Sequence, residues 1–574
     1  MMVHCCPYCR WPQRQLALVL RHFLTCFPKR PMQAFGLAVL LGLPCSYGQQ
    51  TRIWFEDISD ATGIDFVHCD GSSGDHYLVE AVASGLASLD YDRDGLIDLY
   101  FLNGANLRGS HYDPPPTNAM YRNLGQFTFQ SIGDIARTAD AGFGLGVAVG
   151  DVDNDGFDDI YLNNFGANRL LHNNGDGTYS PWESDVIACG EKVGGGVVMF
   201  DMEGDGDLDI YVANYIQFTY DSPASEFRGR VVYGGPLLYP KEKDDLLRNN
   251  GDGSFTNVSS SSGIADAAEW GMGVIAFDYD ADGDTDVFVA NDSTKNFLWE
   301  NDGHGRFTEI GLLTGLAFDH RGTPQGSMGI DVADVNGDGL LDIFQTTYTK
   351  QLVTLYENLG NGFFEDATLR WGVGKGTYYL VNWGTALADF DNDGDKDLFI
   401  ANGHIHDNLD DVDETVSYRI ANQVFDNIDG RFMIDVSARA GPGMRVLESS
   451  RGMLADDLNN DGLIDVVILN SRGRPTVLAN RSRTPYRSIQ VELVGTVSNR
   501  SAAGSRVEIE VAGKKQLLEM HCGKGYQSHF GSRLHFGLNA AEQIDAFRVW
   551  WHAGSKEEFR SVPMRETIIF IEPQ

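Results

Sequence analysis

One acidic nonapeptide occurs seven times along the chain, and this repeat constrains the fold more than any other feature of the sequence. Each copy has Asp at positions 1, 5 and 9, Gly at position 6, and Asp, Glu or Asn at position 3. A repeated supersecondary unit is the sequence signature of solenoids and propellers. The seven copies, loops 1 to 7 below, begin at Asp90, Asp151, Asp201, Asp278, Asp334, Asp389 and Asp457.

Each acidic loop lies between short apolar runs. In the second unit a Gly-rich run, 144–150, precedes the loop and a strand-like run, 160–163, follows it. A second hairpin comes next, marked by Asn-Gly and Asp-Gly pairs such as those of 174–177, which tolerate positive φ. Its last strand begins at an aromatic residue, as at Phe255 or Phe364. Four short antiparallel strands per unit, repeated seven times, predict an all-β, seven-bladed β-propeller, because each blade buries its faces on its neighbours.

The two ends of the repeat region complement each other. The segment 55–59 reads as a fourth strand that precedes the first loop, whereas the strand 475–480 after the seventh loop has no such successor. We therefore expect the N-terminal strand to complete the last blade and close the ring. An open stack of calcium-binding repeats is the alternative.

The loops carry the ligands of a hard cation. Carboxylates at positions 1, 3, 5 and 9 and the main-chain carbonyl of position 7 can surround one ion, because Gly at position 6 allows a sharp turn. Oxygen ligands at this density suit Ca²⁺, and the absence of Cys and His from the loops argues against zinc. The predicted ligands are Asp90, Asp92, Asp94, Leu96 and Asp98; Asp151, Asp153, Asp155, Phe157 and Asp159; Asp201, Glu203, Asp205, Asp207 and Asp209; Asp278, Asp280, Asp282, Asp284 and Asp286; Asp334, Asn336, Asp338, Leu340 and Asp342; Asp389, Asp391, Asp393, Asp395 and Asp397; Asp457, Asn459, Asp461, Leu463 and Asp465.

The prediction is thus about seven Ca²⁺ ions, acting first as folding cofactors. Asn336 and Asn459 remove a carboxylate from loops 5 and 7, and Glu203 changes the reach in loop 3, so we expect these three loops to bind more weakly. The formal net charge of −37 argues against nucleic acid as a partner, since a phosphate backbone requires a basic surface.

The N-terminus reads as an export signal. Lys29 and Arg30 precede an apolar run, 34–43, that is too short to cross a bilayer and ends in small residues. We therefore predict a targeting segment over 1–48, a mature chain without a transmembrane span, and a secreted, cell-surface or periplasmic location. A start at Met32 and lipid attachment at Cys45 remain alternatives.

Cysteines do not form a disulfide framework in the mature chain. Five of the eight lie in the first 45 residues, including a Cys6–Cys9 dithiol spacing that has no βαβ context. Only Cys69, Cys189 and Cys522 remain, and a Cys69–Cys189 bridge is left open.

The repeats resemble the FG-GAP/VCBS repeats of integrin α-subunit propellers and of many bacterial secreted proteins. The resemblance covers about residues 51–484 and includes the pair Phe143-Gly144 before the second loop. The insertion with Tyr233-Gly-Gly-Pro236 is similar to that of the cartilage acidic protein 1-like group. The resemblance implies extracellular calcium binding and adhesion or recognition, without an established reaction.

The last residues, 485–574, alternate apolar and polar side chains over several short runs, which predicts a small β-sandwich. Segments such as Gly523-Lys-Gly-Tyr526-Gln-Ser528 resemble the ASPIC/UnbV domain. Trp550 and Trp551 should point to opposite faces of a strand; core or edge packing is favoured over stacking on a sugar.

We expect a non-catalytic protein that recognises an unidentified extracellular protein or glycan, because no nucleophile elbow, phosphate-binding Gly motif or cofactor-lysine signature occurs. The alternative is an extracellular enzyme that acts on polysaccharide, with a site near His404 and His406 and the nearby Asp407, Asp410 and Asp411. A purely structural surface-layer role is a third interpretation.

Overall fold

The computed structural model describes residues 51–574 except 83–84, 223–224, 411–412, 414–416 and 564. The predicted targeting segment 1–48, with Cys5, Cys6, Cys9, Cys26 and Cys45, lies outside the described residues.

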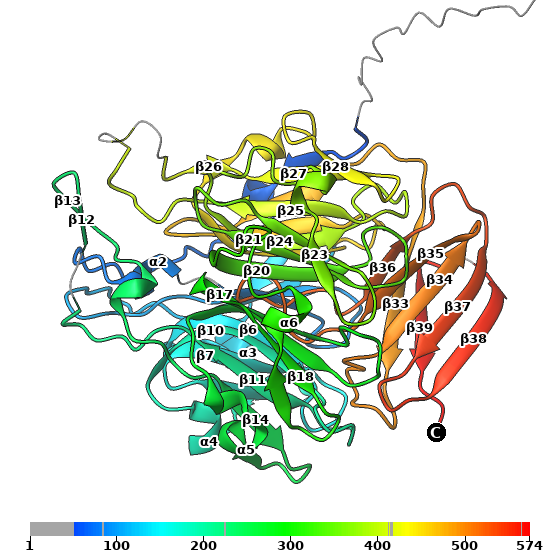
Figure 1. Cartoon of the computed structure of the whole chain (residues 1–574), viewed down its shortest axis with the longest axis horizontal. Helices are drawn as coiled ribbons and strands as arrows, with labels where there is room; N and C mark the ends of the chain where they lie inside the picture. Colours follow the sequence, from blue (N-terminus) through cyan, green and yellow to red (C-terminus); the bar gives the residue numbers. More distant parts are fainter. Residues whose placement is uncertain (1–50, 83–84, 223–224, 411–412, 414–416, 564) are drawn as a thin grey trace, which may run out of the picture. The chain divides into compact units, whose positions relative to one another are not determined.

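Within the described residues the strands form seven four-stranded antiparallel blades and a separate C-terminal pair of sheets (Figure 1). The acidic loop of each blade joins its first and second strands. The blades are: blade 1, β2 (Leu86–Leu89), β3 (Asp98–Phe101), β4 (Ala119–Asn123), β5 (Phe129–Ser131); blade 2, β6 (Phe143–Gly150), β7 (Asp159–Gly166), β8 (Arg169–Asn173), β9 (Tyr179–Pro181); blade 3, β10 (Lys192–Phe200), β11 (Asp209–Asn214), β14 (Asp245–Asn249), β15 (Phe255–Asn257); blade 4, β16 (Gly271–Phe277), β17 (Asp286–Thr294), β18 (Phe297–Asn301), β19 (Phe307–Glu309); blade 5, β20 (Gln325–Ala333), β21 (Asp342–Thr347), β22 (Thr354–Asn358), β23 (Phe364–Asp366); blade 6, β24 (Asn382–Ala388), β25 (Asp397–Asn402), β27 (Gln423–Ile428), β28 (Phe432–Asp435); blade 7, β30 (Ser450–Asp456), β31 (Asp465–Asn470), β32 (Thr476–Asn480) and β1 (Phe55–Asp57).

The ring is closed by the N-terminal strand, as the sequence predicts. Strand β1 pairs antiparallel with β32, with Phe55 opposite Asn480 and Asp57 opposite Leu478. The last blade therefore combines strands from both ends of the repeat region, which excludes the open stack. Closure removes the exposed sheet edges that an open stack would present.

Apolar side chains fill the spaces between blades. Val147 and Ile160 of blade 2 pack against Leu89 of blade 1, and Leu398 of blade 6 packs against Phe344 of blade 5. Ladder bonds also join two pairs of blades directly, through β7 with β10 and β17 with β20. The core is therefore a set of interfaces between blades.

Short helices and small ladders lie in the connections. The helices are α2 (Leu78–Val82), α3 (Gly133–Ala136), α4 (Asp185–Ala188), α5 (Ser259–Ser262), α6 (Gly311–Thr314) and α7 (Thr368–Trp371), the 3-10 turns are η1 (Ser59–Ala61), η2 (Pro236–Leu238), η3 (Ile264–Asp266) and η4 (Gly443–Arg445), and the ladders are β12 (Ser225–Phe227) with β13 (Arg230–Val232) and β26 (Ile420–Ala421) with β29 (Leu447–Glu448). Of the helices in the described part of the chain, none is long and apolar enough to cross a membrane.

The C-terminal residues form a small β-sandwich around their own apolar core, again as predicted. Trp551 is buried in this core, whereas Trp550 is half-buried and packs against the core between blades 4 and 5. Neither indole ring is free to stack on a sugar. One sheet has the order β36 (Leu534–Gly537), β33 (Ser488–Val494), β39 (Thr567–Ile571), and the other β35 (Lys514–Glu519), β34 (Arg506–Val511), β37 (Ile544–Trp550), β38 (Lys556–Val562).

A loop of the sandwich enters the centre of the ring. Isolated bridges join Cys522 to Met199 and Gly525 to Ile330, on the innermost strands of blades 3 and 5. The next residue, Tyr526, is fully buried, and its hydroxyl donates to the carbonyl of Val82 at 2.8 Å. No sequence pattern predicts that this segment fills the propeller channel.

The open question of a disulfide is answered in the negative. Cys69, Cys189 and Cys522 are all free thiols in the described part of the chain. Cys69 lies before the first loop, whereas Cys189 follows α4 at the outer side of blade 2, where its sulfur is 3.7 Å from the Tyr161 hydroxyl.

Candidate metal centres

Position 1 and position 9 of every acidic loop bind main-chain amides in the same way. In loop 2, Asp151 accepts the N–H of Asp155 through Oδ1 and the N–H of Gly156 through Oδ2. Asp159 accepts the N–H of Val152 and, from the third strand, the N–H of Asn173. The same four bonds occur in the other six loops, so these two carboxylates fold each loop and join it to its blade.

Two positions of each loop have a left-handed backbone. Glycine at position 6 has φ between 84° and 103°, for example 101° at Gly156, which confirms the predicted sharp turn. Position 4 is also left-handed, with φ of 58° at Arg93 and Asn154 and 65° at Ala281. The sequence does not signal this conformation, because the residue type at position 4 varies from loop to loop. Position 5 then accepts the N–H of position 7, as Asp155 does from Phe157 at 2.8 Å, so the loop curls around its carboxylates.

Carboxylates converge in four loops. Oxygen atoms of positions 1, 3 and 5 lie within 4.8 Å of one another in loops 1, 2 and 4, and those of positions 1, 3 and 9 do so in loop 6. The position-3 oxygens Asp92 Oδ1, Glu203 Oε2 and Asp391 Oδ1 are buried and have no hydrogen-bond partner among the described residues. Convergent, oxygen-only donors with free buried oxygens fit a Ca²⁺ ion.

Loops 3, 5 and 7 give no such triad in the described part of the chain. Asn336 and Asn459 turn their amide groups toward the position-5 carboxylates, donating to Asp338 and Asp461 at 3.0 and 2.8 Å. The amide at position 3 thus replaces one carboxylate, and its N–H group occupies one oxygen of the position-5 carboxylate. The weaker binding expected of loops 3, 5 and 7 stays a prediction.

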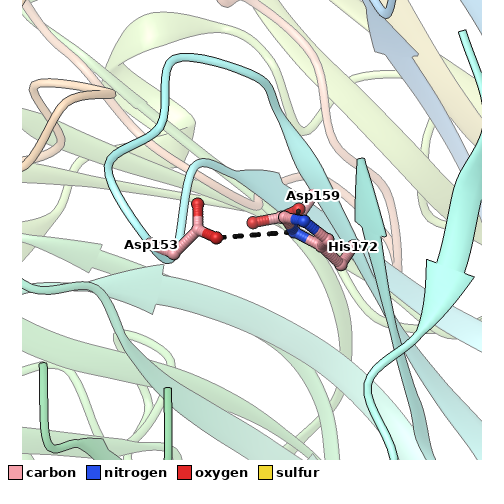
Figure 2. Close-up of side chains that lie close together, drawn as sticks. All are labelled: Asp153, Asp159 and His172. Carbon is pink, nitrogen blue, oxygen red and sulfur yellow. Dashed lines mark hydrogen bonds and ion pairs between the residues drawn. The ribbon is translucent and has the colours of Figure 1, made fainter. Parts of the chain in front are cut away.

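Blades 1 to 6 carry an ionisable side chain at the fourth position of the third strand, which the sequence alone does not signal; blade 7 has Ala479 there. In blade 1 it is Arg122, whose Nη2 lies 2.6 Å from Asp92 and 3.0 Å from Asp94. In blade 2 it is His172, whose Nδ1 lies 3.2 Å from Asp159 and 3.6 Å from Asp153 (Figure 2). A histidine therefore does lie beside an acidic loop, although none occurs within the loops.

The charge of this third-strand residue divides blades 1 to 6 into two groups. Blades 1 to 3 have a basic group there, the third being Arg248 at 4.0 Å from Glu203. Blades 4 to 6 have Glu300, Glu357 and Asp426. Burial is the first cause of the raised pKa of Asp391, and the charges of Asp393, Asp389 and Asp426 raise it further. A cation added to loops 1 and 3 meets a competing guanidinium charge, whereas His172 lies with Asp153 and Asp159 as a third candidate ligand of loop 2. Loops 4 and 6 offer additional negative charge.

Burial raises the pKa of many loop carboxyls. The pKa of Asp98 rises to about 8 and that of Asp151 to about 7, first because burial penalises the charged form and then because neighbouring carboxylates repel it. Burial and adjacent carboxylates also raise the pKa of Asp391 to about 8. In contrast, the pKa of His172 is raised by its hydrogen bond to Asp159. Without a cation, the Asp98 and Asp391 carboxyl groups therefore hold protons at neutral pH.

Asparagine side chains link neighbouring blades. In the third strand of each blade, the Nδ2 group of one asparagine, here called the latch asparagine, donates to the carbonyl of loop position 2 in the preceding blade. The latch asparagines are Asn123, Asn173, Asn249, Asn301, Asn358, Asn427 and Asn480. The sequence marked these residues only as the beginning of hairpin turns.

The histidine segment lies on the side of the ring opposite the acidic loops, because it joins the second and third strands of blade 6. Burial lowers the pKa of His404 to about 3 and that of His406 to about 4, so both rings are neutral. His406 stacks on Tyr233, with ring centroids 6.1 Å apart, and Asp407 pairs with Arg472 at 2.6 Å. Among the described residues these side chains form no metal-ligand triad.

Two protein families match the chain. The FG-GAP-like repeat family matches residues 90–162, 151–212, 232–289, 278–345 and 334–400, and the ASPIC and UnbV family matches residues 495–574. The matched repeats together cover just over half of the chain.

Curated relatives extend the similarity. Cartilage acidic protein 1 of Homo sapiens is 24% identical over 442 residues, which cover 72% of this chain and 60% of that protein. The Mus musculus protein of the same name is 25% identical over 455 residues, which cover 74% of this chain and 64% of that protein. The chain thus spans about three fifths of the length of the curated relatives it matches.

Among solved structures, an Agrocybe aegerita lectin described as recognising non-reducing terminal N-acetylglucosamine has a TM-score of 0.36 and 18% identity, covering 62% of this chain and 80% of that chain. A likeness this low carries no argument about the ligand.

Proposed function

The chain belongs to the FG-GAP-like repeat family and is related to cartilage acidic protein 1, and from this premise we propose that it is a secreted, calcium-binding β-propeller that recognises an extracellular protein or glycan. The observation that carries the calcium part is the convergence of carboxylates in loops 1, 2, 4 and 6, together with buried position-3 oxygens in loops 1, 3 and 6 that lack a hydrogen-bond partner among the described residues. The residues that would hold the ions are those at loop positions 1, 3, 5 and 9, with the carbonyl of position 7. A bound ion supplies the positive charge that allows these carboxylates to lie together when ionised.

The recognition surface is proposed on the side of the ring opposite the acidic loops. Side chains of the C-terminal sandwich reach the acidic loops, for example from Arg533 to Asp90 and from Arg506 to Asp278. The insertion between β11 and β14 emerges on the other side and exposes apolar side chains. Their exposed fractions are 40% at Phe227, 48% at Val231, 73% at Leu237 and 47% at Leu238. A cluster of exposed apolar residues on one insertion is typical of a protein or glycan contact.

Calcium binding is tested by elemental analysis of the purified protein after exchange into calcium buffer. We expect close to seven Ca²⁺ per chain, with loops 5 and 7 weakest and loops 4 and 6 strongest. Fewer than about four bound ions would contradict the set of seven sites that the loop ligands define.

Recognition is tested on glycan and protein arrays with and without EDTA. We expect calcium-dependent binding that is lost when Leu237 and Leu238 are both replaced by Asp. The matched control replaces Leu312 and Leu313, which are 66% and 73% exposed on α6 of blade 4. Equal loss of binding in both double variants would reject the proposed surface. Binding that is unchanged by EDTA would reject the calcium dependence.

Export and domain division are further parts of the proposal. The mature chain should begin between about residues 45 and 50, which mass spectrometry of the N-terminus measures directly. We propose that the propeller spans 51–484 and the ASPIC/UnbV sandwich 485–574, since strand β32 ends at Asn480 and β33 begins at Ser488. A protease that cuts only within 481–487 would support this boundary.

A further inference from the structure

Three side chains of the C-terminal sandwich contact the first aspartate of three acidic loops. Each brings an N–H group to the same atom, Oδ2, of that aspartate. The pairs are Arg533 with Asp90 in loop 1 at 3.3 Å, Arg506 with Asp278 in loop 4 at 3.2 Å, and Gln490 with Asp457 in loop 7 at 2.8 Å.

The contacted oxygen already has a main-chain donor. In loop 7, Oδ2 of Asp457 also accepts the N–H of Gly462 at 2.7 Å, while Oδ1 accepts the N–H of Asp461 at 3.0 Å. The donor from the sandwich adds a third bond, which fixes the plane of the carboxylate. Gln490 is 7% exposed and Asp457 is 4% exposed, so water competes little for this bond.

The shared feature is an N–H donor and not a positive charge, because the uncharged Gln490 contacts Oδ2 of the first aspartate in loop 7 as the arginines do in loops 1 and 4. Donors that orient a ligating carboxylate from behind set the affinity of metal sites. We propose that Arg533, Arg506 and Gln490 are positioning residues for the calcium sites of loops 1, 4 and 7. The inference rests on the proposed calcium binding and adds that the sandwich determines the affinity of part of the propeller.

Loops 2 and 5 lack this contact, whereas in loop 3 His552 Nε2 of the sandwich lies 3.9 Å from Asp201 Oδ2. Asp151 in loop 2 and Asp334 in loop 5 receive no side-chain donor from the sandwich among the described residues, and their carboxylates are bonded only within their own loops. The sandwich therefore acts on a subset of the seven loops, which makes its effect separable from general stabilisation of the ring.

The docked sandwich leaves the loops accessible to ions. A cavity of about 400 Å³ borders loops 1 and 2, and Arg500 and Arg533 of the sandwich line its other side. A cavity of about 900 Å³ borders loop 7 and is lined by Arg487 and Arg565. Ions can therefore exchange while the sandwich stays in place, so affinity is measurable on the intact chain.

The test uses Gln490→Met in the full-length protein, because this change removes the donor with little change in volume or charge. Calcium titration calorimetry should show one site weakened by roughly 10- to 100-fold, the range found when groups that orient metal ligands are removed. The matched control is Gln516→Met: Gln516 is 9% exposed in the same sandwich but donates to the carbonyl of Gly537. It should leave the loop 7 site unchanged, and loop 7 is the site to compare because the Gln516 side chain borders Gly394 of loop 6.

Three further variants separate positioning from structure. Arg533→Met should weaken loop 1 in the same way, whereas Arg533→Lys, which keeps an N–H donor, should bind within about threefold of the original protein. In a chain that already carries Asp461→Ala in loop 7, Gln490→Met should have no further effect on calcium binding, because its target site is already lost.

Three results would overturn the inference. Unchanged calcium affinity in Gln490→Met would show that the donor has no role, and equal weakening by Gln490→Met and Gln516→Met would show that only sandwich stability matters. Both results leave calcium binding itself intact. An original protein that binds no calcium at all would instead refute the proposed function and the inference together.

Discussion

The side-chain amide of Asn123 in blade 1 donates a 2.8 Å hydrogen bond to the main-chain carbonyl of Leu458 in blade 7. This contact spans the point where the ring closes. The same nitrogen donates at 2.9 Å to the carbonyl of Ile97 beside its own loop. One fully buried amide thus joins the first acidic loop, the last acidic loop and the third strand of blade 1. Closure depends on this polar contact as well as on the pairing of β1 with β32.

Asn123→Ala should lower the free energy of unfolding by about 1–3 kcal/mol, because it leaves buried carbonyl groups without a donor. Chemical denaturation measures this change. The matched control is Asn250→Ala in the exposed turn of blade 3, which should change stability by less than about 0.5 kcal/mol. Equal effects of the two substitutions would show that the latch asparagine is not a closing contact.

Asp155→Asn isolates the charge of one loop ligand. The amide oxygen can still accept the N–H of Phe157, so the turn is kept while the negative charge is lost. In about 1 mM Ca²⁺ the protein should lose about 1.4 kcal/mol of stability, the mass-action contribution of one site with a Kd of about 0.1 mM. Without calcium the melting temperature should be unchanged or higher, because charge repulsion is relieved. A loss of the same size in both conditions would identify loop 2 as a purely structural turn.

Arg122→Gln should tighten calcium binding at loop 1. The guanidinium contacts Asp92 and Asp94, two predicted ligands, and a positive charge at such a distance opposes a divalent cation by about 1–2 kcal/mol even at high dielectric. Calorimetry should show a gain in affinity of about five- to thirtyfold that shrinks at high ionic strength. Arg560→Gln, with its side chain 74% exposed on the sandwich, is the control. Weaker calcium binding in Arg122→Gln would mean that the arginine supports the site instead of competing with the ion.

The pH dependence of stability should reverse when calcium is added. Burial raises the pKa of Asp98 and Asp391 to about 8 and of Asp151 to about 7, all from 3.8. The ion-free folded state therefore holds more protons than the unfolded chain between about pH 4 and 8, and its stability falls as pH rises through this window. With calcium bound the carboxylates stay ionised, so protons compete with the ion and stability falls at low pH. Melting curves in calcium-depleted and calcium-containing buffers measure both slopes, and parallel curves would contradict the model of proton and ion competition.

The sequence by itself determined the blade count, the closure by residues 55–57 and the left-handed glycines, because these follow from short-range patterns repeated in register. A nonapeptide with Asp and Gly at fixed positions specifies its own turn. A single four-stranded sheet cannot bury its apolar faces by itself, so each sheet must pack against neighbouring sheets. The sandwich was equally predictable from alternation along strands such as Ser488–Val494 and Arg506–Val511.

Tertiary structure alone decided which groups meet each loop. Arg122 and His172 are 30 and 19 residues from Asp92 and Asp153, and Arg533 is 443 residues from Asp90. Those contacts depend on the angle between strands and on the docking of the sandwich, neither of which leaves a periodic signal. The position of Tyr526 in the channel also depends on tertiary structure, because the surrounding blades form the space in which this loop tyrosine is buried. Local hydrogen bonds fix the shape of each acidic loop, whereas its charge environment is set by residues brought together only by the closed ring.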